Sequence, residues 1–73
     1  MHILVTGGAG YIGSHVCKAL SQKGYIPVTL DNLSLGHRSA VKWGPFVEGD
    51  ILDAPLLNAL CRTYPFKGAI HLA

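Results

Sequence analysis

The 73-residue chain has few cysteines, few charged residues and no long apolar run. Its two cysteines are too few for a disulfide scaffold, and neither they nor the four histidines show metal-ligand spacing. The six basic residues form no cluster, which argues against nucleic-acid binding. No stretch approaches the roughly 18 apolar residues of a membrane span, and Met1-His2 leads straight into a predicted strand, without room for a signal peptide. We therefore expect a cytoplasmic protein without metal, membrane or nucleic-acid partners.

A glycine-rich stretch, Thr6–His15 (TGGAGYIGSH), follows directly behind an apolar, β-branched run. This order predicts a strand, a tight turn and a helix, the unit that places a pyrophosphate on a helix N-terminus. Two spacings fit at once, GxGxxG and GxxGxxG, according to whether the first glycine is Gly8 or Gly7. Gly10 and Gly13 complete both spacings, and we expect Gly10 to admit phosphates and Gly13 to let the helix pack close to the strand.

Two other interpretations of this stretch exist. One is a glycine-rich loop without a ligand, since this spacing by itself is a weak signal. The other is a P-loop, which needs Lys and then Ser or Thr after its last glycine. Here Ser14 and His15 follow Gly13. No ammonium group is available for the β- and γ-phosphates, so the P-loop is excluded.

Asp31 ends the predicted strand that follows the helix, about 20 residues beyond the glycine loop, where a carboxylate can accept both ribose hydroxyls of an adenosine. Its charge would repel the 2′-phosphate of NADP, so NAD is the expected cofactor. The alternative is an Asp that only opens the turn Asp31–Ser34. The strand, loop and helix before it favour cofactor binding.

Periodicity and turn signals predict four strands that alternate with helices. The expected strands are His2–Val5, Tyr25–Leu30, Phe46–Glu48 and Gly68–Leu72, and the expected helices are Tyr11–Lys23, a short Arg38–Trp43 and Ala54–Tyr64. Right-handed crossovers make this βαβαβαβ order an α/β, doubly wound parallel sheet, a partial Rossmann fold with strand order 3-2-1-4. The two longer helices then cover opposite faces, which separates Cys17 from Cys61 and argues against a disulfide.

Local signals add detail to this fold. The first helix places Ile12, Val16, Ala19 and Leu20 on one face at helical spacing, and Gly24 stands at its C′ position. Pro27 conflicts with a central strand, so we place it at the strand's start. In the last helix Asp53 is the expected N-cap, and the expected buried face consists of Leu56, Leu57, Leu60 and Tyr64.

Several motifs together resemble the extended short-chain dehydrogenase/reductase family. The resemblance covers the whole chain but only the N-terminal fifth of such an enzyme. Residues 1–73 are thus expected to be the N-terminal part of an NAD-binding Rossmann domain, without its second half or the substrate domain. The matching motifs are TGGAGYIGSH (Thr6–His15), DNLS (Asp31–Ser34), GHRSAVKWG (Gly36–Gly44), GDILD (Gly49–Asp53) and HLA (His71–Ala73).

The resemblance implies a set of cofactor-binding residues around NAD. Glycines shape the turn, backbone N–H groups reach the pyrophosphate, polar and apolar residues hold the adenosine, and two residues lie against the cofactor where the last strand ends. These residues are Gly7, Gly10 and Gly13 (turn), Tyr11 and Ile12 (pyrophosphate), Asp31 and Asn32 (ribose), Asp50 and Ile51 (adenine), and Leu72 and Ala73 (end of the last strand). One position departs from the family, which often carries Asn where this chain has Leu35.

Within the family, the resemblance implies a homodimeric enzyme that interconverts UDP-glucose and UDP-galactose through a 4-keto intermediate. Such an enzyme needs a Tyr-x-x-x-Lys pair. The residues four positions after Tyr11, Tyr25 and Tyr64 are not lysines, so the chain contains no predicted catalytic residue. The alternatives are another nucleotide-sugar epimerase or dehydratase of the family, and a non-catalytic dinucleotide-binding module.

We predict that the 73-residue chain, expressed alone, does not epimerise UDP-galactose, because it lacks the proton-transferring pair. The last strand would be an open edge, so the isolated chain should also self-associate or remain partly unfolded. A coupled assay for UDP-glucose and size-exclusion chromatography test both expectations. A monomeric, cooperatively folded and active 73-mer would contradict them.

Overall fold

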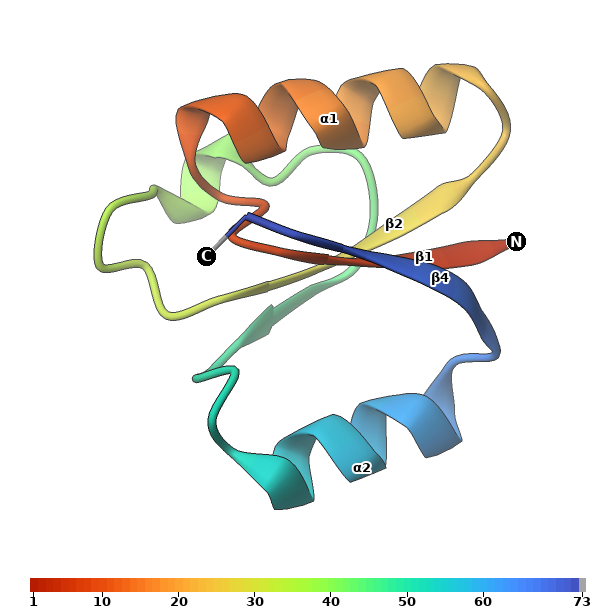
Figure 1. Ribbon diagram of the computed structural model, residues 1–73. Coiled ribbons are helices and arrows are strands. Elements are labelled where there is room, and N and C mark those ends of the chain that lie inside the picture. The colour runs from red at the N-terminus through yellow and green to blue at the C-terminus, as the bar shows by residue number, and fades with distance from the viewer. Residues whose placement is uncertain (73) are drawn as a thin grey trace.

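Four parallel strands form one sheet in the order β3-β2-β1-β4, and the two longer helices cover its opposite faces (Figure 1). The computed structural model describes residues 1–72. The predicted α/β class, strand order and placement of the two helices are confirmed. The elements are β1 (His2–Thr6), α1 (Tyr11–Gln22), β2 (Ile26–Asp31), the 3₁₀ helix η1 (Arg38–Ala40), β3 (Phe46–Glu48), α2 (Ala54–Thr63) and β4 (Phe66–His71).

The turn between β1 and α1 depends on glycines for two different reasons. Gly7 has a φ of 77°, in the left-handed region that favours glycine. A Cβ at Gly13 would overlap the Gly7 carbonyl oxygen and lie 2.7 Å from the Gly8 Cα. The close packing predicted for Gly13 is therefore present, although its partner is the turn after β1 rather than the strand itself. Gly8 is also tight, since a Cβ there would lie 2.6 Å from the Thr29 hydroxyl oxygen.

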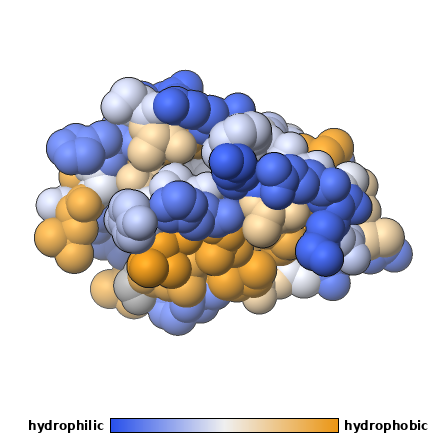
Figure 2. Space-filling model, turned by 90° about the horizontal axis from the view of Figure 1, so that it is seen from above, coloured by the Kyte–Doolittle hydropathy of each residue, from blue (hydrophilic) through white to orange (hydrophobic). Residues whose placement is uncertain are grey.

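The apolar face of α1 that the spacing predicts is only partly its buried face. Ile12 is 62% exposed and Ala19 is also exposed, although the helical spacing places both on one face with Val16. Gly13 and Cys17 are buried instead, and Val16 is half-buried. Because Gly13 has no side chain, it is the point where α1 comes closest to the sheet. The helix therefore turns the side with Gly13 and Cys17 inward. Figure 2 looks from above onto the outer side of α1 and shows hydrophilic residues over much of it, with a hydrophobic area in the lower middle of the view.

Strand β2 is the centre of the core, with Val28 and Leu30 fully buried. Pro27 lies within this strand, opposite Ile3 of β1. Its missing N–H leaves no partner in β1 without a hydrogen bond, as the bonds of its neighbours show. The Ile26 N–H donates to the Met1 carbonyl, on the β1 side of the strand. The Thr29 N–H donates to the Pro45 carbonyl, on the β3 side. Successive residues of β2 thus point their N–H groups alternately toward β1 and toward β3. Pro27, which has no N–H, faces the β3 side, where pairing with β3 starts only at Thr29. The predicted position of Pro27 near the strand's start is confirmed.

The second crossover helix begins and packs as the sequence predicts. The Asp53 carboxylate caps α2 by accepting a hydrogen bond from the Leu56 N–H at 3.1 Å. Leu60 is buried, and Leu57 and Tyr64 are half-buried. The predicted C′ glycine of α1 is also confirmed, since Gly24 has a φ of 88°.

Two boundaries differ from the predictions by more than one residue. The helix expected over Arg38–Trp43 is a single 3₁₀ turn that ends at Ala40, because its N-cap residue makes no side-chain hydrogen bond and Val41 is already extended. Strand β4 begins at Phe66 rather than two residues later. Its pairing with β1 continues past His71, since the Leu72 N–H donates to the Thr6 carbonyl at 2.9 Å.

Replacing Gly13 with Val tests the close approach of α1 to the glycine turn. We expect Gly13→Val in the full-length protein to lower the free energy of unfolding by about 1–3 kcal/mol, the usual cost of overpacking, as measured by urea denaturation. Gly68→Val is the matched control in β4, where an added Cβ meets nothing closer than the Ile3 Cδ1 at 3.9 Å. Equal stability of the two variants would refute the packing role of Gly13.

Candidate functional site

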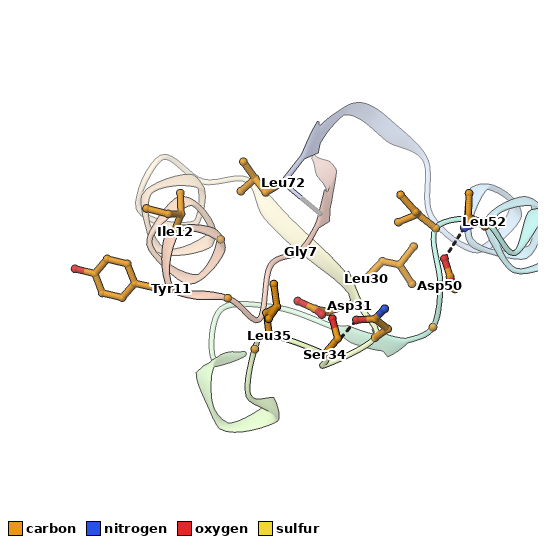
Figure 3. A pocket seen from close by; sticks show the side chains of 16 residues that line it. Gly7, Tyr11, Ile12, Leu30, Asp31, Ser34, Leu35, Asp50, Leu52 and Leu72 are labelled. Carbon is orange, nitrogen blue, oxygen red and sulfur yellow. Dashed lines mark hydrogen bonds between the residues drawn. The ribbon is translucent and has the colours of Figure 1, made fainter.

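A cavity of about 550 Å³ opens where β1, β2 and β4 end (Figure 3). The carboxyl ends of parallel strands are where open α/β sheets bind their ligands. Its walls come from the glycine turn, the first turn of α1, the loop after β2, the loop after β3 and the end of β4. The lining residues are Gly7, Gly10, Tyr11, Ile12, Gly13, Leu30, Asp31, Asn32, Ser34, Leu35, Gly36, Gly49, Asp50, Ile51, Leu52 and Leu72.

The structure brings the sequence-predicted site residues together in this one cavity. Every predicted residue that the structure describes is among the lining residues, and Ala73 lies outside the described residues. Sequence reasoning did not assign a binding role to some of the neighbours, among them Ser34, Leu35 and Gly36, which lie two to four positions after Asn32. Their place next to the Asp31–Asn32 pair was the available signal. Leu35 is 95% exposed, so the position that departs from the family pattern has its side chain at the rim.

The N-terminus of α1 is open toward the cavity. Its N-cap Gly10 makes no side-chain hydrogen bond, and its first turn contains no acidic residue. The first helical hydrogen bond is the one that the Ser14 N–H donates to the Gly10 carbonyl at 2.9 Å. The N–H groups of Tyr11 and Ile12 therefore have no acceptor within the helix. Such a helix end offers free donors and partial positive charge to an anion.

The Asp31 carboxylate joins the end of β2 to the glycine turn. Its Oδ2 accepts a hydrogen bond from the Ala9 N–H at 3.0 Å, and its Oδ1 accepts one from the Leu33 N–H at 2.8 Å. In Figure 3 the side chain lies beside Ser34 and Leu35 on the cavity wall. Each carboxylate oxygen has a further lone pair, so the group is still able to accept from hydroxyls of a ligand.

Two more polar side chains of the cavity shape their own loops. The Asp50 Oδ1 accepts from the Leu52 N–H at 2.9 Å, and the Asn32 Oδ1 accepts from the Ser34 N–H at 3.0 Å (Figure 3). Both are turns in which a side chain bonds the backbone two residues on. The other oxygen of Asp50 and the amide nitrogen of Asn32 make no such bond and are exposed to a ligand.

The end of β4 is fixed against β1 by a side-chain cluster. The Thr6 Oγ1 lies 2.6 Å from the His71 Nδ1, and it also accepts a hydrogen bond from the Leu72 N–H at 3.2 Å. Because the hydroxyl accepts from Leu72, its proton is free to be donated to an unprotonated Nδ1. This pairing holds Leu72 at the cavity.

The buried thiol is a packing group rather than a candidate nucleophile. Cys17 lies 3.6 Å from the Thr29 hydroxyl on the inner side of α1, outside the cavity lining. Burial raises the pKa of the Cys17 thiol, an effect that the Thr29 hydrogen bond opposes. The thiol is therefore protonated at neutral pH. Residues 1–72 contain no cluster of three or more His, Cys, Asp or Glu side chains able to hold a metal ion.

The described part of the chain has no helix with the length and apolar character that crossing a membrane requires. Cys17 and Cys61 are both free thiols and lie on the helices of opposite faces, as predicted.

Known proteins resemble the chain over nearly its whole length. Residues 3–73 match the family model described as the NAD dependent epimerase/dehydratase family. A UDP-glucose 4-epimerase of Rhizobium leguminosarum bv. trifolii is 51% identical over 71 residues, which cover 97% of this chain and 22% of that protein. The chain thus spans about a fifth of the length of such relatives.

Solved structures show the same likeness in three dimensions. The UDP-glucose 4-epimerase from Brucella ovis in complex with NAD is 56% identical with a TM-score of 0.96, over 99% of this chain and 22% of that one. The dTDP-glucose 4,6-dehydratase from Bacillus anthracis in complex with NAD is 30% identical with a TM-score of 0.90, over 100% of this chain and 26% of that one.

The double acceptor role of Asp31 predicts an effect on the amides that it binds. An Asn at this position has one acceptor oxygen, so Asp31→Asn should leave the Ala9 or the Leu33 N–H unpaired and speed its hydrogen exchange about tenfold. Asp50→Asn is the matched control, because one oxygen is enough for its single bond to Leu52. Unchanged exchange at both Ala9 and Leu33 would show that the carboxylate does not hold the loop.

Proposed function

The chain belongs to the NAD dependent epimerase/dehydratase family, and we propose that it is the NAD-binding part of a UDP-glucose 4-epimerase. One observation carries the proposal. Residues from the glycine turn, α1 and the loops after β2 and β3 line a single cavity at the carboxyl ends of the strands, together with Leu72. The proposed activity is the interconversion of UDP-glucose and UDP-galactose.

The donors and acceptors of the cavity fit a dinucleotide. Its volume of about 550 Å³ is within the usual range for ligand sites. The uncapped N-terminus of α1 suits a pyrophosphate, and the Asp31 carboxylate suits ribose hydroxyls at the end of β2. Asp50 and Ile51 are proposed to hold the adenine edge, with Asp50 as the acceptor for its amino group. Leu72 then lies on the nicotinamide side, and Ala73, outside the described residues, is proposed to join it.

Backbone groups rather than cationic side chains are proposed to bind the phosphates. No lysine or arginine is among the lining residues that the structure describes. The N–H groups of Tyr11 and Ile12 are the donors that the pyrophosphate requires, and Gly10 leaves the approach open. A Cβ at Gly10 would meet only the Gly7 carbonyl oxygen, at 3.5 Å. Its role is thus proposed to be toward the ligand, in contrast with the packing role of Gly13.

When bound, the nicotinamide of NAD accepts and returns a hydride in reactions of this class. The residues of this chain bind and orient the cofactor, and none of them is proposed to transfer the proton, because the sequence has no Tyr-x-x-x-Lys pair. A cytoplasmic location is proposed from the free Cys17 and Cys61 thiols, which suit a reducing compartment. A homodimer of the full-length protein stays a prediction.

A dehydratase of the same family is the second candidate, since a dTDP-glucose 4,6-dehydratase matches the whole chain at 30% identity. The epimerases from Rhizobium leguminosarum and Brucella ovis share 51% and 56%, which favours the epimerase. Incubation of the full-length protein with UDP-galactose and with dTDP-glucose separates the two. Formation of UDP-glucose from UDP-galactose would support the epimerase. Formation of a 4-keto-6-deoxy sugar from dTDP-glucose would support the dehydratase instead.

The charge of Asp31 predicts selection of NAD over NADP. Asp31→Ala in the full-length protein should weaken NAD binding by about 1–3 kcal/mol, the cost of losing hydrogen bonds to a charged acceptor. Calorimetric titration with each cofactor measures the effect. Glu48→Ala is the control, because Glu48 is an exposed carboxylate of β3 outside the cavity lining. Equal affinity of the unmodified protein for NAD and NADP would refute the ribose assignment.

A further inference from the structure

The loop 32–37 is seated on a single residue of the glycine turn, Ala9. The Ala9 carbonyl accepts a hydrogen bond from the His37 N–H at 3.1 Å. The Ala9 N–H donates to the Asp31 carboxylate, at the other end of the loop, at 3.0 Å. Ala9 is only 2% exposed, so the loop covers it. The two segments that would face the ribose and the phosphates of a dinucleotide are therefore joined through one residue.

Gly36 is the closest point of this contact. A Cβ at Gly36 would lie 2.5 Å from the Ala9 carbonyl oxygen and 2.9 Å from the Gly10 nitrogen. Both atoms belong to the backbone and are held by the turn, so neither yields as a flexible side chain would. Only Gly7 and Gly24 among the described glycines have a positive φ. The backbone dihedral angles of Gly36 are thus ones that other residues can adopt, and glycine is required there only by the lack of space for a side chain.

We propose that Gly36 is a positioning residue for the cofactor. Because Gly36 has no side chain, the loop 32–37 seats on the backbone of Ala9 and holds Ser34 and Leu35 as one wall of the cavity. The same seat keeps the Ala9 N–H on the Asp31 carboxylate, and so fixes the charge that selects NAD over NADP. This inference rests on the proposed function, since it takes NAD as the ligand.

The seat predicts a change in selectivity that general destabilisation does not produce. A methyl group at Gly36 would lift the loop and move the Ala9 N–H away from the Asp31 carboxylate. The carboxylate would then be less well placed both to accept the ribose hydroxyls and to repel a 2′-phosphate. A protein that merely populates its folded state less would lose affinity for NAD and NADP by the same factor.

The test is Gly36→Ala in the full-length protein, with dissociation constants for NAD and NADP measured by titration. We expect NAD binding to weaken about tenfold, as for one misplaced hydrogen bond to a charged group, and NADP binding to weaken less, so that the preference for NAD falls. Gly68→Ala adds the same methyl group where the nearest atom is 3.9 Å away, and should change neither constant. Gly10→Ala adds its methyl group on the phosphate side, where the nearest atom is the Gly7 carbonyl oxygen at 3.5 Å, and should weaken both cofactors alike.

A second measurement needs no variant. Hydrogen exchange of the His37 amide should be slow in the unmodified protein and slower still with NAD, because NAD fixes the loop that this amide anchors. Fast His37 exchange that NAD leaves unchanged would overturn the inference. So would Gly36→Ala with unchanged constants, or with both constants weakened by the same factor. An unmodified protein that does not bind NAD overturns the proposed function itself, before any variant is compared.

Discussion

The backbone of Ala9 is the constraint on which the candidate site depends. Its N–H and its carbonyl are bonded to the two ends of the loop after β2, at Asp31 and at His37. It reaches them because the glycine turn packs closely against both β2, at Thr29, and the start of α1, at Gly13. Gly7 supplies the left-handed backbone of this turn, and Gly8 and Gly13 supply the space. A side chain at Gly8 or Gly13 would push apart the backbone segments that meet there.

A site held in this way has particular electrostatic properties. Its candidate anion-binding groups are backbone N–H groups at the open end of α1, and its formal charges are the carboxylates Asp31 and Asp50. Such a site favours a ligand that carries its negative charge at the helix end and hydroxyl or amino groups at the carboxylates. The contrast with α2 supports this reading, because there the Asp53 carboxylate already occupies the helix end.

Much of this arrangement could be predicted from the sequence, because it is encoded in short-range patterns. The glycine spacing predicted the turn, and the strand–helix alternation with right-handed crossovers fixed the order of the four strands. The buried side of α1, which carries Gly13 and Cys17, could not be predicted, since spacing records that Ile12 and Ala19 share an apolar face but not which residue touches the sheet first. The seating of Gly36 on Ala9 could not be predicted, because it depends on the path of a loop with no periodicity.

The central claim is that this cavity holds NAD, with its pyrophosphate at the start of α1 and its adenosine ribose at Asp31. Amide NMR of the full-length protein during an NAD titration tests it most directly. The account predicts that the largest shifts occur at Tyr11, Ile12 and the residues around Asp31, while the far end of α2 near Arg62 is unchanged. Saturable NAD binding that shifts other residues and leaves Tyr11, Ile12 and Asp31 unaffected would contradict it.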